Sequence, residues 1–379
     1  MPTQAISKTS QARRIVILGG GYAAMAAVNS LAKQAPECHV TLIAPRKAHI
    51  KITLLHETLR YSLGRICVPY AELAKRFGFR FIQGKLRFNP ENLPCWQQRQ
   101  TLRLGTTAIP FDYLILATGA KSLTPEKSEH SLTVDDFCLN QGQAVIQEAG
   151  MRERAAISVV GAGATGIQFL FELSHLLKRK SGKACQLRLI NYESRVLGQF
   201  PQRFHDYVLE RLLDEGIDYF PNAAFKCQTE DSIVLSHRET GEAFKLPSGL
   251  SLLFMGVKPN PFPIQTNAFG QVMANGETLN RIFAAGDCAH FTAPGANTPS
   301  AQVAIRKGKT VAENVLREGI PNSAMRVYDY TEQGYFVSLG LSDGIGWLGK
   351  PENIFTGLPA VALKKAIESK YSLMLSGID

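Results

Sequence analysis

The sequence predicts an α/β protein in which two similar units each carry a parallel sheet flanked by helices. An apolar segment, a glycine turn and a helical stretch follow one another from residue 14, and the same order returns from residue 157. Further apolar segments of strand length lie between and after these two units. A chain of 379 residues, 45% hydrophobic and 20% charged, has the composition of a globular protein and the length of about two domains.

The first unit begins with a β-branched apolar segment at residues 14–18, which we expect to be a buried strand. Three glycines follow and predict a tight turn, and the alanine-rich residues 22–35 predict a helix. Residues 40–43 supply a second buried strand. Residues 14–44 thus have the order and the length of a βαβ unit that binds half of a dinucleotide.

The second unit repeats this order with a strand at residues 157–160, the turn GAGATG, a helix to about residue 177 and a strand at residues 186–190. Apolar strands are also expected at residues 111–120 and 250–257. The Pro-containing segments 121–130 and 258–263 that follow them predict two crossings between domains. The second unit is therefore predicted to be inserted in the first, giving one domain of residues 1–120 and 258–325 and another of residues 121–257.

Both turns have the glycine spacing of a dinucleotide-binding loop. The first glycine permits the tight turn, the second lets a pyrophosphate approach the backbone, and the third position allows close packing of a helix whose N-terminus faces the phosphate. One such loop is weak evidence, but two in register, each inside a βαβ unit, predict that the chain binds two dinucleotides. The three positions are Gly19, Gly21 and Ala24 in the first loop, and Gly161, Gly163 and Gly166 in the second.

The acidic residue that usually ends the second strand of such a unit, and binds the ribose, is missing from both units. Ala44 and Asn191 stand in its place, so that the first ribose is expected to be held by the backbone, by water or by a neighbour such as Arg46. Asn191, with Arg195 nearby, removes a charge that would repel a 2′-phosphate and so favours NADPH. Alternatively, Glu193 serves as the acidic residue and favours NADH.

Several motifs in one order resemble the pyridine-nucleotide flavoprotein superfamily. They are GGGYAA, FDYLILATGA, VVGAGATG, FMGVKPNP and RIFAAGDCAHF followed by TPSAQVA, over residues 14–320. Within the superfamily, the chain is most similar to the type II NADH dehydrogenase branch, with its relatives similar to apoptosis-inducing factor. The resemblance implies two Rossmann-like domains arranged in three layers as in glutathione reductase, FAD as the cofactor, and NADH or NADPH as the hydride donor.

The resemblance also assigns roles to individual residues. FAD is expected to contact the first glycine loop, Thr118 and Gly119, and the side chain of Asp287, whose alternative role is to cap the next helix. NAD(P)H is expected at the second glycine loop. The full set of residues expected to bind the two dinucleotides is Gly19, Gly21, Tyr22, Ala23, Ala24, Arg46, Thr118, Gly119, Gly161, Gly163, Thr165, Gly166, Asn191, Gly256, Gly286, Asp287 and Ala301.

The residues expected near the reacting rings depart from the branch. Its second glutamine after an Ala-Gln pair is replaced by Arg306, and its glutamate after the second glycine loop by Gln168. We expect Gln302, Arg306 and His56 on the side of the electron acceptor or at the flavin edge, and Gln168 and Glu172 on the nicotinamide side. A quinone is the acceptor that the resemblance implies. A soluble reductase with a protein acceptor or oxygen, or a redox sensor with little turnover, stays open because of these departures.

The seven cysteines exclude a thiol-disulfide reductase, because no two of them are close in sequence. A sulfide:quinone oxidoreductase would need cysteines near the flavin, for which Cys138 and Cys288 are the candidates; packing roles are the alternative.

Charge and hydropathy limit the partners and the location. The formal net charge of +10 suits dinucleotides or an anionic membrane, and no motif indicates nucleic acid or a metal. No long apolar run or secretory signal is evident, so a cytoplasmic protein is expected. Residues 326–379 predict an α+β tail, with a hairpin-like piece at residues 334–349 and a helix at about 358–375. Its apolar residues Leu363, Ile367, Tyr371 and Met374 either dock on a membrane or pack on the protein, and a homodimer through this tail is left open.

Overall fold

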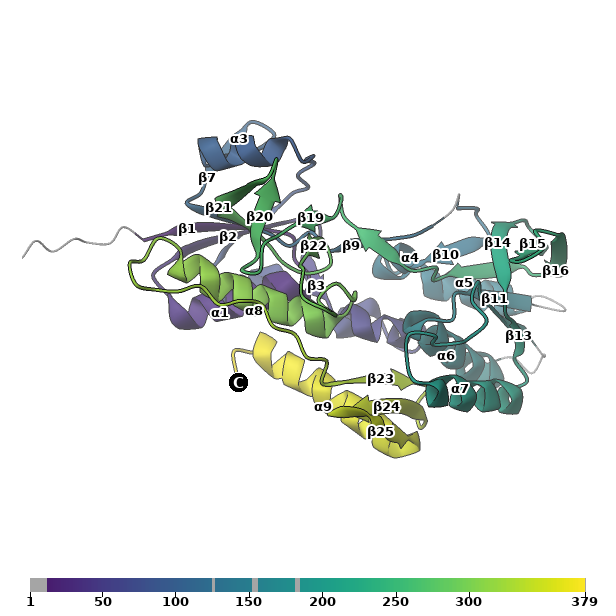
Figure 1. Ribbon diagram of the computed structural model, residues 1–379. Helices are drawn as coiled ribbons and strands as arrows, with labels where there is room; N and C mark the ends of the chain where they lie inside the picture. The colour runs from purple at the N-terminus through teal and green to yellow at the C-terminus, as the bar shows by residue number, and fades with distance from the viewer. Residues whose placement is uncertain (1–11, 125–126, 152–155, 181–184, 379) are drawn as a thin grey trace, which may run out of the picture.

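The computed structural model describes residues 12–124, 127–151, 156–180 and 185–378. It is an α/β structure in which two parallel sheets lie side by side, with the C-terminal segment beneath both (Figure 1). This is the α/β class that the sequence predicts. The apolar side chains of each sheet pack against its helices and form separate cores.

The first sheet has the strand order β20-β21-β8-β1-β2-β5, and all its pairs are parallel except β20 with β21. Helices α1 and α8 pack together on this sheet (Figure 1). A Cβ atom at Gly308 on α8 would collide with the backbone of Ala23 on α1, so glycine permits this close crossing. The elements are β1 (Arg14–Leu18), α1 (Tyr22–Gln34), β2 (His39–Ala44), α2 (Tyr70–Phe77), β5 (Arg80–Gln83), β8 (Tyr113–Leu116), β20 (Gln271–Ala274), β21 (Glu277–Ala284) and α8 (Ala301–Arg317).

The second sheet is parallel throughout, with the order β10-β17-β11-β12-β13. A three-stranded antiparallel sheet, β14-β15-β16, adjoins it. The elements are β10 (Ser131–Thr133), α4 (Val134–Cys138), α5 (Gly142–Met151), β11 (Ala156–Val160), α6 (Ala164–Lys180), β12 (Gln186–Ile190), α7 (Gln202–Glu215), β13 (Asp218–Phe220), β14 (Ala223–Gln228), β15 (Ser232–His237), β16 (Ala243–Pro247) and β17 (Leu250–Leu253).

Two short strands join the sheets where the sequence places the crossings. Strand β9 (Ala120–Ser122) leads out of the first sheet, and β18 (Val257–Pro259) leads back to it. They pair antiparallel, so that the two connections run side by side. The strands of the second sheet all come from the segment between them, whereas the first sheet takes strands from both sides of that segment.

Several short elements connect the strands of the first sheet. Between β2 and β5 the chain forms a small hairpin and two 3₁₀ segments, and a helix with a second hairpin precedes β8. These elements are β3 (Ala48–Ile50), η1 (Ile52–Leu59), η2 (Leu63–Ile66), β4 (Cys67–Pro69), α3 (Asn92–Arg99), β6 (Thr101–Leu104) and β7 (Thr107–Pro110), with the pair β19 (Ile264–Gln265) and β22 (Ala289–His290) further on.

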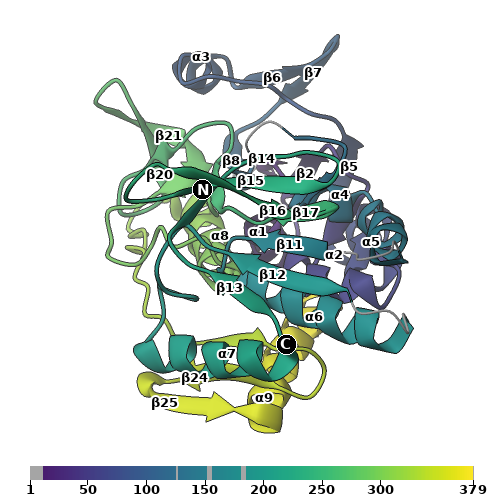
Figure 2. The same cartoon turned by 90° about the vertical axis from the view of Figure 1, so that its right-hand side faces the viewer.

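The C-terminal segment is an antiparallel sheet of β23 (Gly334–Ser338), β24 (Gly344–Leu348) and β25 (Lys350–Thr356), followed by helix α9 (Gly357–Leu375). The third strand was not predicted. Figure 2 shows α7 lying over β24, where the Tyr207 hydroxyl donates to Asp343 at 2.7 Å. No helix within the described residues is long and apolar enough to cross a membrane.

Candidate functional site

The first glycine loop joins β1 to α1 and has the geometry of a phosphate cradle. Gly19 has a φ of 110°, and a Cβ atom there would collide with the carbonyl oxygen of Ala117, so only glycine fits. A Cβ atom at Gly21 would meet no protein atom within 4 Å, which leaves the backbone at the start of α1 open to a ligand. The N-terminal N–H groups of α1 can therefore bind a pyrophosphate.

The second glycine loop repeats this geometry between β11 and α6. Gly161 has a φ of 105°, and a Cβ atom there would collide with the carbonyl oxygen of Phe254 on the neighbouring segment. At Gly166 a Cβ atom would collide with the carbonyl oxygen of Gly161, whereas Gly163 again faces open space. In each loop, therefore, no side chain fits at the first glycine, and the backbone at the second glycine is open to a ligand. The sequence predicts these two roles for the two glycines.

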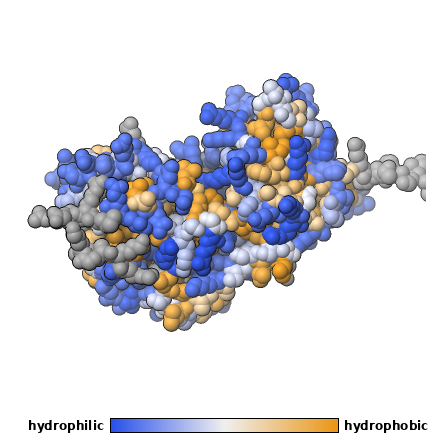
Figure 3. Space-filling model, turned by 180° about the vertical axis from the view of Figure 1, so that it is seen from behind, coloured by the Kyte–Doolittle hydropathy of each residue, from blue (hydrophilic) through white to orange (hydrophobic). Residues whose placement is uncertain are grey.

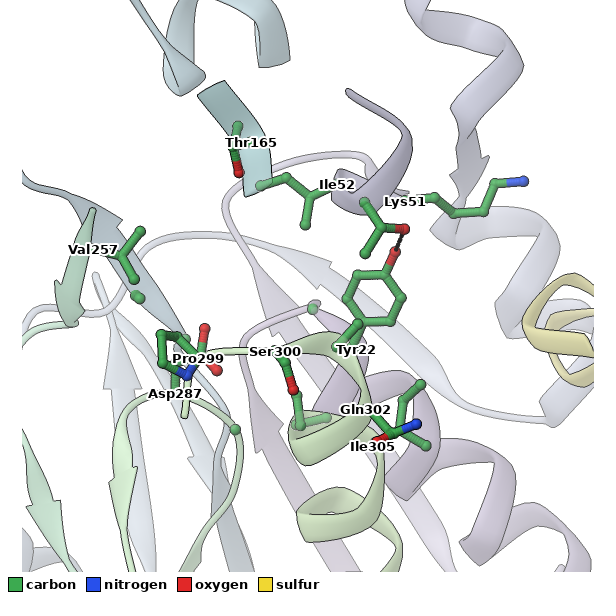
Figure 4. A pocket seen from close by; sticks show the side chains of 18 of the residues that line it. Tyr22, Lys51, Ile52, Thr165, Val257, Asp287, Pro299, Ser300, Gln302 and Ile305 are labelled. Carbon is green, nitrogen blue, oxygen red and sulfur yellow. Dashed lines mark hydrogen bonds between the residues drawn. The ribbon is translucent and has the colours of Figure 1, made fainter. Parts of the chain in front are cut away.

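Both loops border one cavity of about 2930 Å³, roughly three times the upper end of the range for a single drug-sized ligand. Figure 4 shows that Tyr22 on α1, Thr165 on α6 and Asp287 after β21 all border the same space. The predicted residues that line the cavity are Gly19, Gly21, Tyr22, Ala23, Arg46, His56, Thr118, Gly119, Gly161, Gly163, Thr165, Gly166, Gln168, Asn191, Gly256, Gly286, Asp287, Ala301, Gln302 and Arg306.

Two predicted site residues do not line the cavity. Ala24 is fully buried inside the core of the first sheet, where the third fingerprint position packs its helix. Glu172 is buried with 1% of its surface exposed, and its carboxylate faces Arg60 on the chain after η1. Arg60 Nη2 donates to Oε1 at 2.9 Å and Arg60 Nε lies 2.7 Å from Oε2. The Glu172 carboxylate thus binds Arg60 and does not line the cavity, and its place beside a nicotinamide stays a prediction.

Asp287 lies on the turn after β21 and faces the cavity (Figure 4). Helix α8 begins only at Ala301, and its cap is Ser300, whose hydroxyl accepts a hydrogen bond from the Val303 N–H at 3.2 Å. Asp287 is therefore not a helix cap. Burial raises the pKa of Asp287 to about 6, and the positive charge of Lys307 opposes that rise. A partly buried carboxylate at this position suits a hydrogen bond from a ribityl or sugar hydroxyl.

The residues at the two ribose positions have other partners. Asn191 accepts a hydrogen bond from the Ala162 N–H at 3.2 Å and donates to the carbonyl oxygens of Glu193 and Arg195. Its amide thus shapes the loop beside the cavity. The Glu193 carboxylate is paired with Arg238, which also lies over the Tyr192 ring. At the ribose position of the first unit, Arg46 lies 3.4 Å from Asp135 in an exposed ion pair.

On the first turns of α8, Gln302 and Arg306 line the cavity and contact the chain that leads into the tail. Gln302 accepts a hydrogen bond from the Tyr330 hydroxyl at 3.1 Å, and the Arg306 guanidinium lies 5.7 Å from the centre of the Tyr330 ring. Tyr330 was not among the predicted residues, because no motif marks it and its place depends on how the tail folds back.

A second polar cluster joins α6, η1 and the tail. The Ser338 hydroxyl donates to Gln168 Oε1 at 3.1 Å and lies 3.3 Å from His56 Nε2. Lys364 Nζ contacts both Ser338 and His56 and forms an ion pair with Glu368 at 3.1 Å. Burial, aided by the charges of Lys364 and Arg60, lowers the pKa of His56 well below its usual range, so this imidazole is neutral. Of this cluster only Gln168 and His56 were predicted site residues.

The candidate redox cysteines are packed rather than exposed to the cavity. Cys288 is fully buried, with its Sγ 3.4 Å from the carbonyl oxygen of Ala285, and Cys138 is 5% exposed. All seven cysteines are free. Burial raises the pKa of both thiols, so that neither is a ready thiolate.

Comparisons with known proteins identify the family of the chain. The family model for pyridine nucleotide-disulphide oxidoreductases matches residues 13–308. A type II NADH:quinone oxidoreductase of Staphylococcus aureus is 25% identical over 404 aligned residues, which cover 97% of this chain and 96% of the relative.

Solved structures resemble the whole chain. NDH2 from Plasmodium falciparum, solved in complex with NADH, superimposes with a TM-score of 0.79 at 15% identity, covering 95% of this chain and 94% of its own. The sulfide:quinone oxidoreductase of Aquifex aeolicus superimposes with a TM-score of 0.76 at 18% identity, covering 97% and 92%. Since the family model spans well over half of the sequence, the chain belongs to the pyridine nucleotide-disulphide oxidoreductase family.

Proposed function

We propose that the chain is an FAD-dependent oxidoreductase that takes a hydride from NADH or NADPH and passes electrons to a quinone. One observation carries the proposal: a single cavity borders both phosphate cradles, Asp287 and the polar side chains at the tail. Bound FAD would supply the redox chemistry, and the protein would position the two rings in contact and exclude water. The names of the similar Staphylococcus and Plasmodium proteins support this assignment.

We assign the two dinucleotides to the two sheets. Residues 1–120 and 258–325 form the FAD domain, in which Gly19, Gly21 and the start of α1 hold the pyrophosphate and Asp287 binds the ribityl or phosphate region. Residues 121–257 form the NAD(P)H domain, with Gly161, Gly163 and the start of α6 at the pyrophosphate. The open backbone at Gly21 and at Gly163 supports both assignments.

The nicotinamide donor is expected to include NADPH. Asn191 carries no charge, and the nearby carboxylate of Glu193 is neutralised by Arg238, so little repels a 2′-phosphate. NADH remains a donor, because nothing at this position excludes an unphosphorylated ribose. Initial rates of flavin reduction with each donor measure the preference.

The acceptor is expected beside α8 and the tail. Gln302 and Arg306 border the cavity from the first turns of α8, and His56 of η1 and Gln168 of α6 border it as well. The Tyr330 ring and the Ser338 hydroxyl orient these groups. We propose that they position the acceptor at the flavin edge, and we propose no direct role for Glu172.

The tail is proposed to bring this site to the cytoplasmic face of a membrane. Helix α9 turns Tyr371 and Met374 inward and has Ile367 and Leu373 at the cavity, but leaves Leu358 at its start exposed outside the cavity. An orange patch lies at the lower edge of Figure 3, where Figure 1 places β25 and α9. Exposed apolar side chains on a basic protein suit a peripheral contact with anionic lipid. A dimer through the same surface is the alternative, which the sedimentation of the protein without lipid would reveal.

Sequential anaerobic mixing tests the acceptor. The yellow protein is first reduced with NADH or NADPH and then mixed with a soluble ubiquinone or menaquinone analogue, and the flavin absorbance is followed. Rapid recovery of the oxidised spectrum is expected. Reduction without recovery by any quinone would instead favour a protein acceptor or a redox sensor.

A further inference from the structure

Lys307 is buried on α8, beneath the turn that carries Asp287. Only 1% of its surface is exposed. Its ammonium donates to the carbonyl oxygens of Ala289 at 2.6 Å and Gly286 at 3.3 Å, and lies 3.4 Å from Asn297 Oδ1. The ring centre of Phe291 is 4.8 Å away. A lysine is almost never buried this completely unless its charge is compensated.

The partners of this ammonium are neutral. Among the described residues, no carboxylate lies within ion-pair distance of Lys307, and the anionic group that its charge stabilises is Asp287. The titratable groups that face Asp287 are Lys307 from α8 and the Cys288 thiol on the same turn. Burial lowers the pKa of Lys307 to about 8, and Cys288 and Asp287 oppose that change. The protein therefore holds a buried cation, at a cost in desolvation, directly behind the cavity.

The position of Lys307 connects three parts of the proposed flavin site. The next residue, Gly308, packs against the backbone of Ala23 on α1, which begins at the first glycine loop. The Lys307 ammonium crosses from α8 to both ends of the turn from Gly286 to Ala289. Any movement of this turn relative to α1 would move Asp287 relative to the phosphate cradle.

We propose that Lys307 is a positioning residue for FAD: it fixes the turn that carries Asp287 and supplies the buried positive charge that lets Asp287 face the cofactor as a carboxylate. This inference rests on the proposed FAD site and adds a function that the family resemblance does not assign. The proposal has two parts: the hydrogen bonds that the Lys307 side chain donates, and its positive charge. They can be tested separately, because K307Q keeps a hydrogen-bond donor and removes the charge.

The test measures how the affinity for FAD depends on pH. Holoprotein is diluted at a series of pH values from about 5 to 9, and the free FAD is measured by its fluorescence. Wild type is compared with K307Q, which keeps a hydrogen-bond donor without the charge, and with K307M, which keeps neither. K226M on exposed β14, outside the cavity, is the control. Thermal melts of the unliganded proteins show whether each variant folds.

The charge of the Asp287 carboxylate determines how the affinity for FAD changes with pH. Asp287 binds FAD as an anion, so affinity is present above the pKa of Asp287, about 6, and is lost as the pH falls through it. Without Lys307 this pKa rises, and the loss should begin about one pH unit higher in both K307Q and K307M. Near pH 8 K307Q should match wild type, whereas K307M should bind FAD about tenfold more weakly because two carbonyl groups lose their donor.

The outcomes are distinguishable. The same pH midpoint in wild type, K307Q and K307M would overturn the role of the charge, and equal affinity of K307M and wild type near pH 8 would overturn the role of the donor. A wild-type protein that binds no FAD at any pH would overturn the proposed function itself.

Discussion

Single glycines determine whether the two loops form and whether they bind a ligand. Gly19 is required by the protein itself, because a side chain there would strike the Ala117 carbonyl group and would need a strained φ of 110°. Gly21 is required only by the proposed ligand, because its Cβ position faces open space. Substitutions at these two neighbouring positions therefore separate folding from binding.

We predict that G19A lowers both the stability of the unliganded protein, by about 1–3 kcal/mol, and its affinity for FAD. G21A should lower the affinity for FAD and leave the melting temperature of the unliganded protein close to that of wild type. Urea unfolding and FAD titration measure the two effects. If G21A binds FAD as wild type does, the first loop is not the pyrophosphate cradle.

Glu172 gives a second prediction, because its carboxylate binds Arg60 and does not line the cavity. Removal of its carboxylate leaves Arg60, whose side chain is 16% exposed, without its partner, so E172Q should lose about 3 kcal/mol of stability. Flavin reduction by NADH in the folded fraction should not change, because Glu172 does not line the cavity. A double variant, R60M with E172M, should recover much of the stability. Slow flavin reduction in a folded E172Q would return Glu172 to the nicotinamide site.

The sequence predicted residues whose roles depend on local geometry and missed those that depend on distant partners. The glycine positions and Asp287 follow from the order of strand, turn and helix, which a short segment determines. Helical spacing places Glu172 one turn after Gln168, but it cannot show that Arg60, 112 positions earlier in the chain, occupies its carboxylate. Tyr330 and Ser338 were missed for the same reason.

At the scale of elements, the first turns of α8 and the folded-back tail together build the proposed acceptor site. We predict that Q302A and R306A slow reoxidation of the reduced flavin by a quinone more than its reduction by NAD(P)H. Q302A also removes the acceptor of the Tyr330 hydroxyl, a bond of about 1 kcal/mol, so Y330F should reproduce part of its effect. Stopped-flow experiments measure flavin reduction and flavin reoxidation separately. Equal slowing of both half-reactions would contradict the placement of Gln302 and Arg306 at the acceptor.

Long and strongly periodic elements were predictable, whereas short ones were not. The strands and helices of both βαβ units lie where the sequence predicts them, because a buried parallel strand, a glycine turn and a helical stretch form a distinct pattern. The 3₁₀ segment η1, the hairpins β3–β4 and β6–β7, and strand β25 have no such pattern. Their conformation depends on packing: Leu54 and Leu59 of η1, for example, are buried in the core of the second sheet.

For the whole molecule, the tail ties the two sheets together. Trp347 and Ile345 are buried in the core of the second sheet. The ring of Tyr371 packs on Tyr22 of α1, beside the first sheet, and its hydroxyl lies 2.9 Å from His49 Nε2 in a hydrogen bond. Because α9 is held from within, its exposed apolar residues are free to contact a flat surface. The tail thus joins the site to the proposed membrane face.

We predict that L358D reduces binding to vesicles of anionic phospholipid by about tenfold, since a buried apolar side chain contributes about 1.5–3 kcal/mol. Reduction of a soluble quinone analogue should be unaffected, because Leu358 does not line the cavity and α9 remains packed through Tyr371. L213D, at an exposed leucine of α7, is the matched control. Co-sedimentation measures binding, and equal binding of wild type and L358D would exclude the start of α9 as the contact.

We infer that one cavity holds FAD and NAD(P)H so that a hydride passes directly between them. Anaerobic stopped-flow reduction with NADH and NADPH, each unlabelled or deuterated on one face of nicotinamide C4, is the measurement to make first. We expect rapid bleaching of the flavin, slowed by deuterium on one face only, because the fixed cavity presents one face of the ring. A flavin that stays oxidised with both donors would show that no hydride passes between the two sites.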